Sequence, residues 1–166
     1  MTSHYVIVAL IALQRLVELV YSRRNIARLV AEGGIVIPEP GYVWIVAVHT
    51  AWVAALFLAI PADAPVQMPF LYLYLGLLVL RVWVMASLGR FWSTRIVTIP
   101  GVPLVRSGPY RFLRHPNYVV VVGEIAVAPL IFGAWWIAIV FTILNGLVIY
   151  LRIKAEEPVL ARRPVQ

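Results

Sequence analysis

The segment FLRHPNYVVVVGEIAVAPLI, residues 112–131, joins two contrasting kinds of sequence. Its first part holds an arginine, a histidine, a proline and a tyrosine, and its second part is an apolar run interrupted by one acid, Glu124. Pro116 disfavours a helical conformation at His115 and suits the first turn of a helix that follows. The segment therefore predicts a basic, aromatic elbow at the mouth of a hydrophobic helix that contains one carboxylate.

The composition of the whole chain indicates a membrane protein. The 166 residues are 63% hydrophobic and 13% charged, whereas soluble domains are about 45–50% apolar and about 25% charged. A net charge of +7 is explained better by basic loops beside a membrane than by nucleic-acid binding. The absence of cysteine excludes a disulfide framework and a thiolate metal site. We expect one membrane domain over residues 1–166, with no metal site.

Five apolar segments follow one another along the chain and predict an all-α integral membrane protein with five transmembrane helices. The last two are separated only by the turn Phe132-Gly133, so we expect them to form a tight antiparallel hairpin. The fourth is short for a span, which needs about 20 residues. The segments run roughly over residues 4–21, 42–60, 69–88, 118–131 and 134–151.

The positions of the basic residues predict the topology. Apart from Arg15 and Arg81, every Lys and Arg lies in residues 22–41, residues 89–116 or the C-terminal tail, which includes Arg162 and Arg163. The N-terminus, the loop over residues 61–68 and the last turn carry none. The positive-inside rule then places the N-terminus outside and the C-terminus in the cytoplasm. Residues 1–89 form three N-terminal spans, and residues 90–166 form a loop, the hairpin and a cytoplasmic tail.

Several polar residues fall inside the predicted spans. Charges in hydrocarbon are costly and normally pair with one another or line a cavity. At 1.5 Å per residue most of these side chains lie about 10–12 Å from the cytoplasmic helix ends. Two interpretations remain open: a salt-bridge layer that fixes helix packing, or the polar floor of a cavity that opens to the cytoplasm. The residues are Arg15, Glu18, His49, Arg81, Glu124 and Asn145.

The end of the fifth segment adds charged residues to the elbow. Arg152 and Glu156 are spaced i,i+4, so they share one face of a helix. The short hairpin turn makes the fourth and fifth helices neighbours, which brings this pair beside His115 and Tyr118. A helix-end salt bridge explains the pair if it is taken alone. Together the two segments predict a cleft with an anion-binding helix N-terminus, a carboxylate and an aromatic wall.

These residues resemble the isoprenylcysteine carboxyl methyltransferases and their bacterial relatives. The motifs that carry the resemblance are Gly108-Pro109-Tyr110, Arg114-His115-Pro116-Asn117-Tyr118 and Arg152-Ile153-Lys154-Ala155-Glu156-Glu157, in the family's order and spacing. The resemblance covers residues 102–160. The N-terminal half, with QRLVELVYSRRN (residues 14–25) and GYVWIVAVHTAW (residues 41–52), resembles a small bacterial branch linked to methylation of lipidic polyketides such as alkylpyrones.

The resemblance implies an enzyme that uses S-adenosylmethionine at the cytoplasmic face of a bacterial membrane. It assigns substrate contact to Arg152, and we add Glu124 as a residue near the acceptor. The acceptor is expected to be a lipophilic or prenylated molecule that is methylated on a carboxylate or an acidic hydroxyl. By the same resemblance, the cofactor contacts are Val102, Pro103, Leu104, Val105, Tyr110, His115, Pro116, Asn117, Tyr118 and Glu156.

Two other functions fit parts of the sequence. Membrane sterol reductases have a related helical core, but they bind NADPH and need a basic pocket for its 2′-phosphate. A non-enzymatic membrane scaffold would use the buried charges only for packing. Measuring cofactor binding separates the three, because each predicts a different result.

Overall fold

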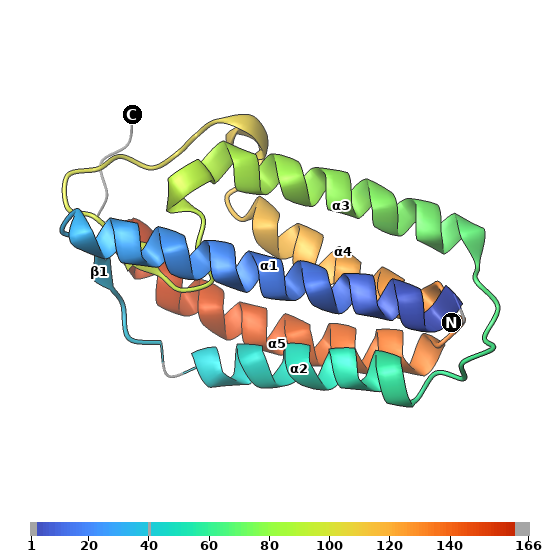
Figure 1. The fold of residues 1–166 in the computed structure, drawn as a ribbon. Helices are drawn as coiled ribbons and strands as arrows, with labels where there is room; N and C mark the ends of the chain where they lie inside the picture. Colours follow the sequence, from blue (N-terminus) through green and yellow to red (C-terminus); the bar gives the residue numbers. More distant parts are fainter. Residues whose placement is uncertain (1–2, 40, 162–166) are drawn as a thin grey trace.

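The computed structural model describes residues 3–39 and 41–161, and over these residues the chain forms an elongated helical bundle (Figure 1). The predicted all-helical fold is confirmed. Arg162 and Arg163 of the predicted basic tail lie outside the described residues. The helices are α1 (Ser3–Ala31), α2 (Tyr42–Leu58), α3 (Met68–Leu88), α4 (Pro116–Leu130) and α5 (Trp135–Leu160).

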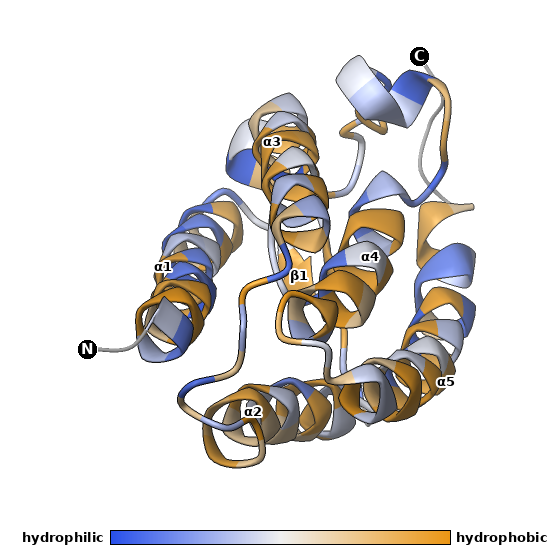
Figure 2. Ribbon diagram, turned by 90° about the vertical axis from the view of Figure 1, so that its right-hand side faces the viewer, coloured by the Kyte–Doolittle hydropathy of each residue, from blue (hydrophilic) through white to orange (hydrophobic). Residues whose placement is uncertain are grey.

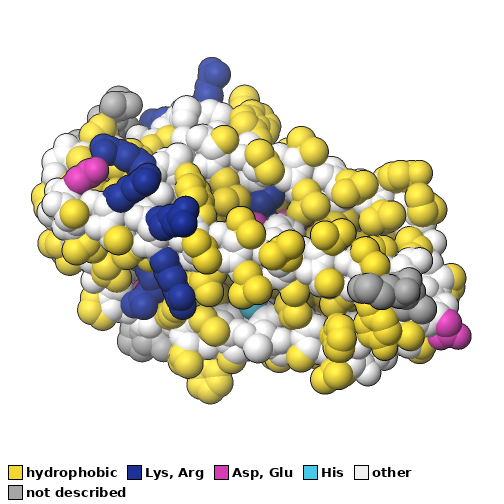
Figure 3. Space-filling view, viewed as in Figure 1, with side chains coloured by type: hydrophobic (Ala, Val, Ile, Leu, Met, Phe, Trp, Pro, Cys, Tyr) yellow, Lys and Arg dark blue, Asp and Glu magenta, His cyan; other side chains and the backbone are white. Residues whose placement is uncertain are grey.

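Three stretches are long and apolar enough to cross a membrane, namely Ser3–Ala31, Met68–Phe91 and Trp135–Leu160. α2 and α4 have 17 and 15 residues, fewer than the roughly 20 that a span needs. Large apolar side chains cover most of the face in Figure 3, and lysines and arginines gather at one end of it. These features are those of an integral membrane protein, while the five-span topology stays a prediction.

α4 lies in the middle of the bundle, between α3 and α5 (Figure 2). It begins at Pro116, directly after His115 in a non-helical conformation, as the sequence predicts. Gly123 allows α4 to approach α3 closely, because a β-carbon at this position would touch Leu77. The central position explains why Glu124, halfway along this helix, is fully buried.

The C-terminal ends of α1, α3 and α5 and the N-terminal end of α4 point to the same end of the bundle (Figure 1). We call it the basic end and define it as residues 22–39, 89–118 and 150–161. Two 3₁₀ turns, η1 (Gly89–Phe91) and η2 (Gly108–Arg111), belong to the loop between α3 and α4. Asn25 of α1 holds this loop by donating from Nδ2 to the backbone oxygen of Trp92 at 2.8 Å. The loop is therefore structured, as its prolines and glycines predict.

Two features of this end differ from the simplest expectation. α1 continues to Ala31, ten residues past the predicted apolar segment. Over these residues the buried face of the helix becomes polar and packs on the loop between α3 and α4, so the helix does not end where the apolar segment ends. A short antiparallel ladder, β1 (Ile35–Val36) with β2 (Val97–Thr98), joins the two basic connections. The ladder places the chain just before α2 against the wall of the site.

Candidate functional site

A cavity of about 740 Å³ enters the bundle from the basic end. Its outer wall contains η2, the start of α4 and the end of α5, and its inner part reaches polar side chains on α2, α3 and α5. The inner residues are His49, Arg81 and Asn145, whose depth was inferred from the sequence. The interpretation of the polar residues as the floor of a cavity therefore holds for these three.

A chain of hydrogen bonds runs across the outer wall. Arg152 Nε donates to the hydroxyl of Tyr118 at 2.8 Å, and that hydroxyl donates to Glu156 Oε2 at 2.5 Å. The ring of His115 stacks on that of Tyr118 with their centroids 5.3 Å apart, and His115 Nδ1 lies 3.7 Å from Glu156 Oε2. The structure thus brings together the elbow and the helix end that the hairpin geometry predicts as neighbours.

Glu39 is a member of the site that sequence reasoning missed. Its buried carboxylate accepts a hydrogen bond from the backbone N–H of Ile96 at 2.7 Å and lies 3.4 Å from Nη1 of Arg152. Arg95, on the cavity wall, lies 3.4 Å from the same carboxylate. In the sequence, the glutamate lies between two prolines, which restrict the backbone on either side of it. This is a weak sequence signal for an acidic side chain held in a fixed position. It connects Arg152 to the loop.

Tyr110 supplies a neutral hydroxyl to the wall. It belongs to η2, which packs against α3, and it lines the cavity. Burial raises the pKa of the Tyr110 hydroxyl above its ordinary value, and the negative charge of Glu156 raises it further. The hydroxyl therefore keeps its proton at neutral pH and acts as a hydrogen-bond donor or acceptor.

Two polar atoms of the outer wall are buried without a hydrogen-bond partner among the described residues. They are Nε2 of His115 and Oδ1 of Asn117, and both residues line the cavity. A buried polar group left unpaired costs about 1–3 kcal/mol. Such free atoms fit a ligand that carries both hydrogen-bond donors and hydrogen-bond acceptors. The carboxylate of Glu156, in the same wall, can face a cationic group of that ligand.

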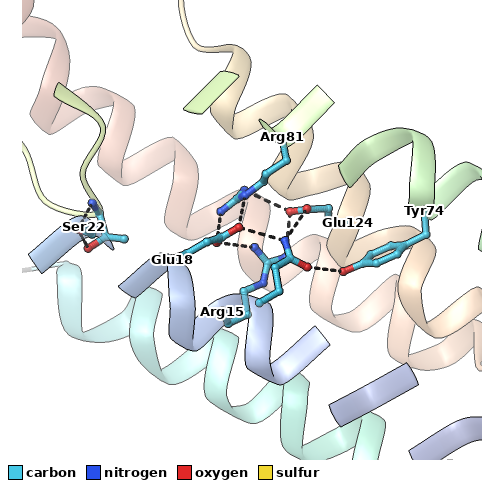
Figure 4. A network of polar contacts seen from close by, with 8 residues as sticks. Arg15, Glu18, Ser22, Tyr74, Arg81 and Glu124 are labelled. Atoms are coloured by element: carbon cyan, nitrogen blue, oxygen red, sulfur yellow. Dashed lines mark hydrogen bonds and ion pairs between the residues drawn. The ribbon is translucent and has the colours of Figure 1, made fainter. Parts of the chain in front are cut away.

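The other buried charges form an ion-pair network between α1, α3 and α4 (Figure 4). Arg81 donates to both oxygens of Glu18, at 2.7 and 2.6 Å, and to Glu124 at 3.2 Å. Arg15 lies 2.9 Å from Glu124 and 3.3 Å from Glu18. Two arginines thus balance two glutamates, as the salt-bridge interpretation predicts for this part of the layer.

Glu124 lies behind the cavity rather than in its wall. Its side chain is fully buried, and Glu124 is not among the described residues that line the cavity. Its ion-pair partner Arg81 does line the cavity. His49 and Asn145 have the opposite placement, since both line the cavity and neither forms an ion pair in the described part of the chain. The single predicted layer is thus two structures, a network and a floor.

The predicted cofactor residues fall into two groups. Most of them line the cavity together, whereas three are not among the described residues that line it. The three are Val102, Pro103 and Pro116. The lining members are Leu104, Val105, Tyr110, His115, Asn117, Tyr118 and Glu156.

Comparison with known proteins gives one family and one relative to report. Residues 68–162 match the model of the isoprenylcysteine carboxyl methyltransferase (ICMT) family, which covers α3, the loop, α4 and α5. Over 166 residues the chain is 31% identical to the "Uncharacterized protein YpbQ" of Bacillus subtilis (strain 168), and the alignment covers 98% of this chain and 99% of that protein. No solved structure matches the chain significantly.

Proposed function

Since this chain belongs to the isoprenylcysteine carboxyl methyltransferase family, we propose that it transfers the methyl group of S-adenosylmethionine to an oxygen atom of a lipophilic acceptor. The family is one of membrane methyltransferases, and the match spans every described residue that lines the cavity except Ile45 and His49 of α2. The observation that carries the proposal is the outer wall, where two residues with unpartnered polar atoms, His115 and Asn117, line the same cavity as the carboxylate of Glu156.

The outer wall fits S-adenosylmethionine chemically. Glu156 offers a carboxylate to a cationic group, His115 Nε2 and Asn117 Oδ1 offer free hydrogen-bonding atoms, and Leu104 and Val105 offer apolar surface. The bound molecule supplies a methyl group on a positively charged sulfur. The protein contributes by holding the reactants in position and by excluding water, which are the main sources of rate in such a displacement.

The acceptor is expected at the inner end of the same cavity. Its apolar tail would remain among the lipid-facing helices, and its oxygen would stop at the polar floor. Arg152 lies between the two ends of the cavity, on the same face of α5 as Glu156 and Asn145. This arrangement explains why the two parts of residues 112–131 differ. The elbow holds a water-soluble molecule, and the buried Glu124 supports Arg81 of the floor.

The direct test is methyl transfer by the purified protein in detergent or lipid. Incubation with S-adenosylmethionine and membrane lipid extract should yield lipids heavier by one methylene, detected by mass spectrometry, and calorimetry should detect S-adenosylhomocysteine binding. Binding of NADPH in its place would support the reductase alternative. Binding of neither molecule would contradict an enzyme of either kind.

Replacing Arg152 by lysine should lower methyl transfer at least tenfold, about 1.4 kcal/mol in barrier height. Lysine keeps the charge but loses the planar fork that contacts Tyr118 and Glu39 together. Affinity for S-adenosylhomocysteine should stay nearly unchanged, because the Tyr118–Glu156 bond does not involve Arg152. Arg28→Lys, on an exposed side chain outside the cavity lining, is the control. A parallel loss of affinity and turnover would assign Arg152 to the cofactor instead.

The five-span topology makes a separate prediction. Reporter fusions after Val66 and after Gln166 should report opposite sides of the membrane, with Gln166 in the cytoplasm, because the basic segments alternate with uncharged ones. Fluorescence and alkaline phosphatase reporters measure the two sides independently. Reporters on the same side would contradict five spans.

A further inference from the structure

Two polar side chains of the cavity floor take no part in the buried ion-pair network. His49 on α2 and Asn145 on α5 line the same cavity, and α2 packs against α5. Their depths are similar, because His49 follows the start of α2 at Tyr42 by seven residues and Asn145 precedes Arg152 by seven residues, about 10.5 Å in each helix. We infer that these two residues bind the oxygen that receives the methyl group, and that this oxygen belongs to a hydroxyl rather than a carboxylate. The inference rests on the proposed function.

The backbone decides which ring nitrogen of His49 carries the proton. Nδ1 lies 2.8 Å from the carbonyl oxygen of Ile45, one turn earlier in α2. A carbonyl oxygen only accepts hydrogen bonds, so Nδ1 donates and the neutral ring keeps Nε2 unprotonated. Nε2 has no hydrogen-bond partner among the described residues. Since the ring lines the cavity, its free lone pair is available to a ligand there.

Asn145 provides the complementary donor. The residue is 1% exposed, and its Nδ2 is buried with no partner in the part of the chain that the structure describes. A buried donor without a partner costs about 1–3 kcal/mol. An oxygen that accepts a hydrogen bond from Nδ2 removes this cost, so the side chain favours a bound acceptor atom.

A hydroxyl group satisfies both residues at once. It has one hydrogen to donate and two lone pairs to accept with, so it donates to Nε2 of His49 and accepts from Nδ2 of Asn145. A carboxylate has no hydrogen to donate, and its charge would face the lone pair of Nε2. The arginine at the floor, Arg81, is already paired with Glu18 and Glu124, so no described residue of the floor offers an unpaired cation to hold an anion.

The same contacts give His49 a chemical role. A phenol-like hydroxyl, with a pKa near 10, is protonated at neutral pH and needs a base to react well. During transfer the hydroxyl gives its proton to His49 Nε2, its oxygen bonds to the methyl carbon, and the electron pair of the broken carbon–sulfur bond stays on sulfur. The cavity opens at the basic end, where the proton leaves to water.

The test uses two probes of equal chain length, a long-chain 4-alkylphenol and a fatty acid, with the full-length protein in detergent. The parent protein should methylate the alkylphenol faster than the fatty acid. His49→Ala should lower the rate with the alkylphenol about a hundredfold, the lower range for general-base catalysis, and leave S-adenosylhomocysteine affinity unchanged. Thr50→Ala, on an exposed neighbour of the same helix, is the control.

Equilibrium binding provides a readout that does not depend on turnover. With S-adenosylhomocysteine bound, Asn145→Ala should weaken alkylphenol binding about three- to tenfold, the loss expected for one hydrogen bond. A preference for the fatty acid, an unchanged rate in His49→Ala, or no binding of the alkylphenol to a protein that binds S-adenosylhomocysteine would each overturn the inference alone. Failure to bind S-adenosylhomocysteine would overturn the proposed function as well.

Discussion

Replacing Glu124 by glutamine should lower the free energy of unfolding by about 3–5 kcal/mol, the cost of breaking a buried ion pair from one side. Glu124 is fully buried and accepts hydrogen bonds from Arg15 at 2.9 Å and from Arg81 at 3.2 Å. Without its charge, two arginines face one glutamate, Glu18, inside the bundle. Unfolding of the detergent-solubilised protein, followed by circular dichroism, measures the loss.

Glu32→Gln is the matched control for this change. Glu32 pairs with Arg90 at 2.9 Å, but both side chains are about half exposed. Exposed ion pairs contribute about 0–1 kcal/mol, so the control should unfold close to the parent. The two variants make the same chemical change and differ in burial. A Glu124→Gln protein as stable as the parent would contradict the network as a source of stability.

Turnover in the Glu124→Gln protein distinguishes the two interpretations of the buried layer. If Glu124 supports packing, methyl transfer per folded molecule should stay near the parental value. If it contacts the acceptor, turnover should fall while stability holds. We expect the first result, because Glu124 lies behind Arg81 and is not among the described residues that line the cavity.

The sequence predicted the helices well, because helix formation in a membrane depends on features that are local in the chain. Apolar segment length and the start of a helix at Pro116 are read directly from neighbouring residues. The elbow and the end of α5 were predicted to meet because a two-residue turn leaves their helices no other arrangement. The site residues His115, Tyr118 and Glu156 accordingly lie together.

The sequence could not divide the polar layer into a network and a floor. Counting residues along a helix gives the depth of a side chain, but it does not give the neighbour that its face meets. Glu124 and Asn145 lie at similar depth, yet one faces α1 and α3 and the other faces the cavity. Which face meets which neighbour depends on the lateral packing of the five helices.

Glu39 escaped prediction for a related reason. Its position at Arg152 depends on the ladder between β1 and β2, which pairs residues about sixty positions apart. Two-residue strands have no hydrophobic periodicity that a sequence could display. The contact therefore appears only when the loop between α3 and α4 and the chain before α2 are folded together.

The outer wall yields the second large effect. Glu156→Ala should weaken binding of S-adenosylmethionine about ten- to a hundredfold, because the loss of one charged hydrogen bond costs about 1.5–3 kcal/mol. Glu156 is the carboxylate of the outer wall nearest to His115 and Tyr118, and it lines the cavity beside the unpartnered Nε2 of His115. His115→Ala should weaken binding by a similar factor. Calorimetry with S-adenosylmethionine measures both variants.

Glu157→Ala separates loss of the site from loss of the helix. The two glutamates are adjacent in α5, but the side chain of Glu157 is about half exposed and lies 3.5 Å from Arg114 instead of facing the cavity lining. Removing it changes the local charge and helix propensity equally, so affinity should stay near the parental value. Equal losses in Glu156→Ala and Glu157→Ala would mean that the charge of the helix end, rather than a contact, attracts the cofactor. Parental affinity in both Glu156→Ala and His115→Ala would place the cofactor elsewhere in the protein.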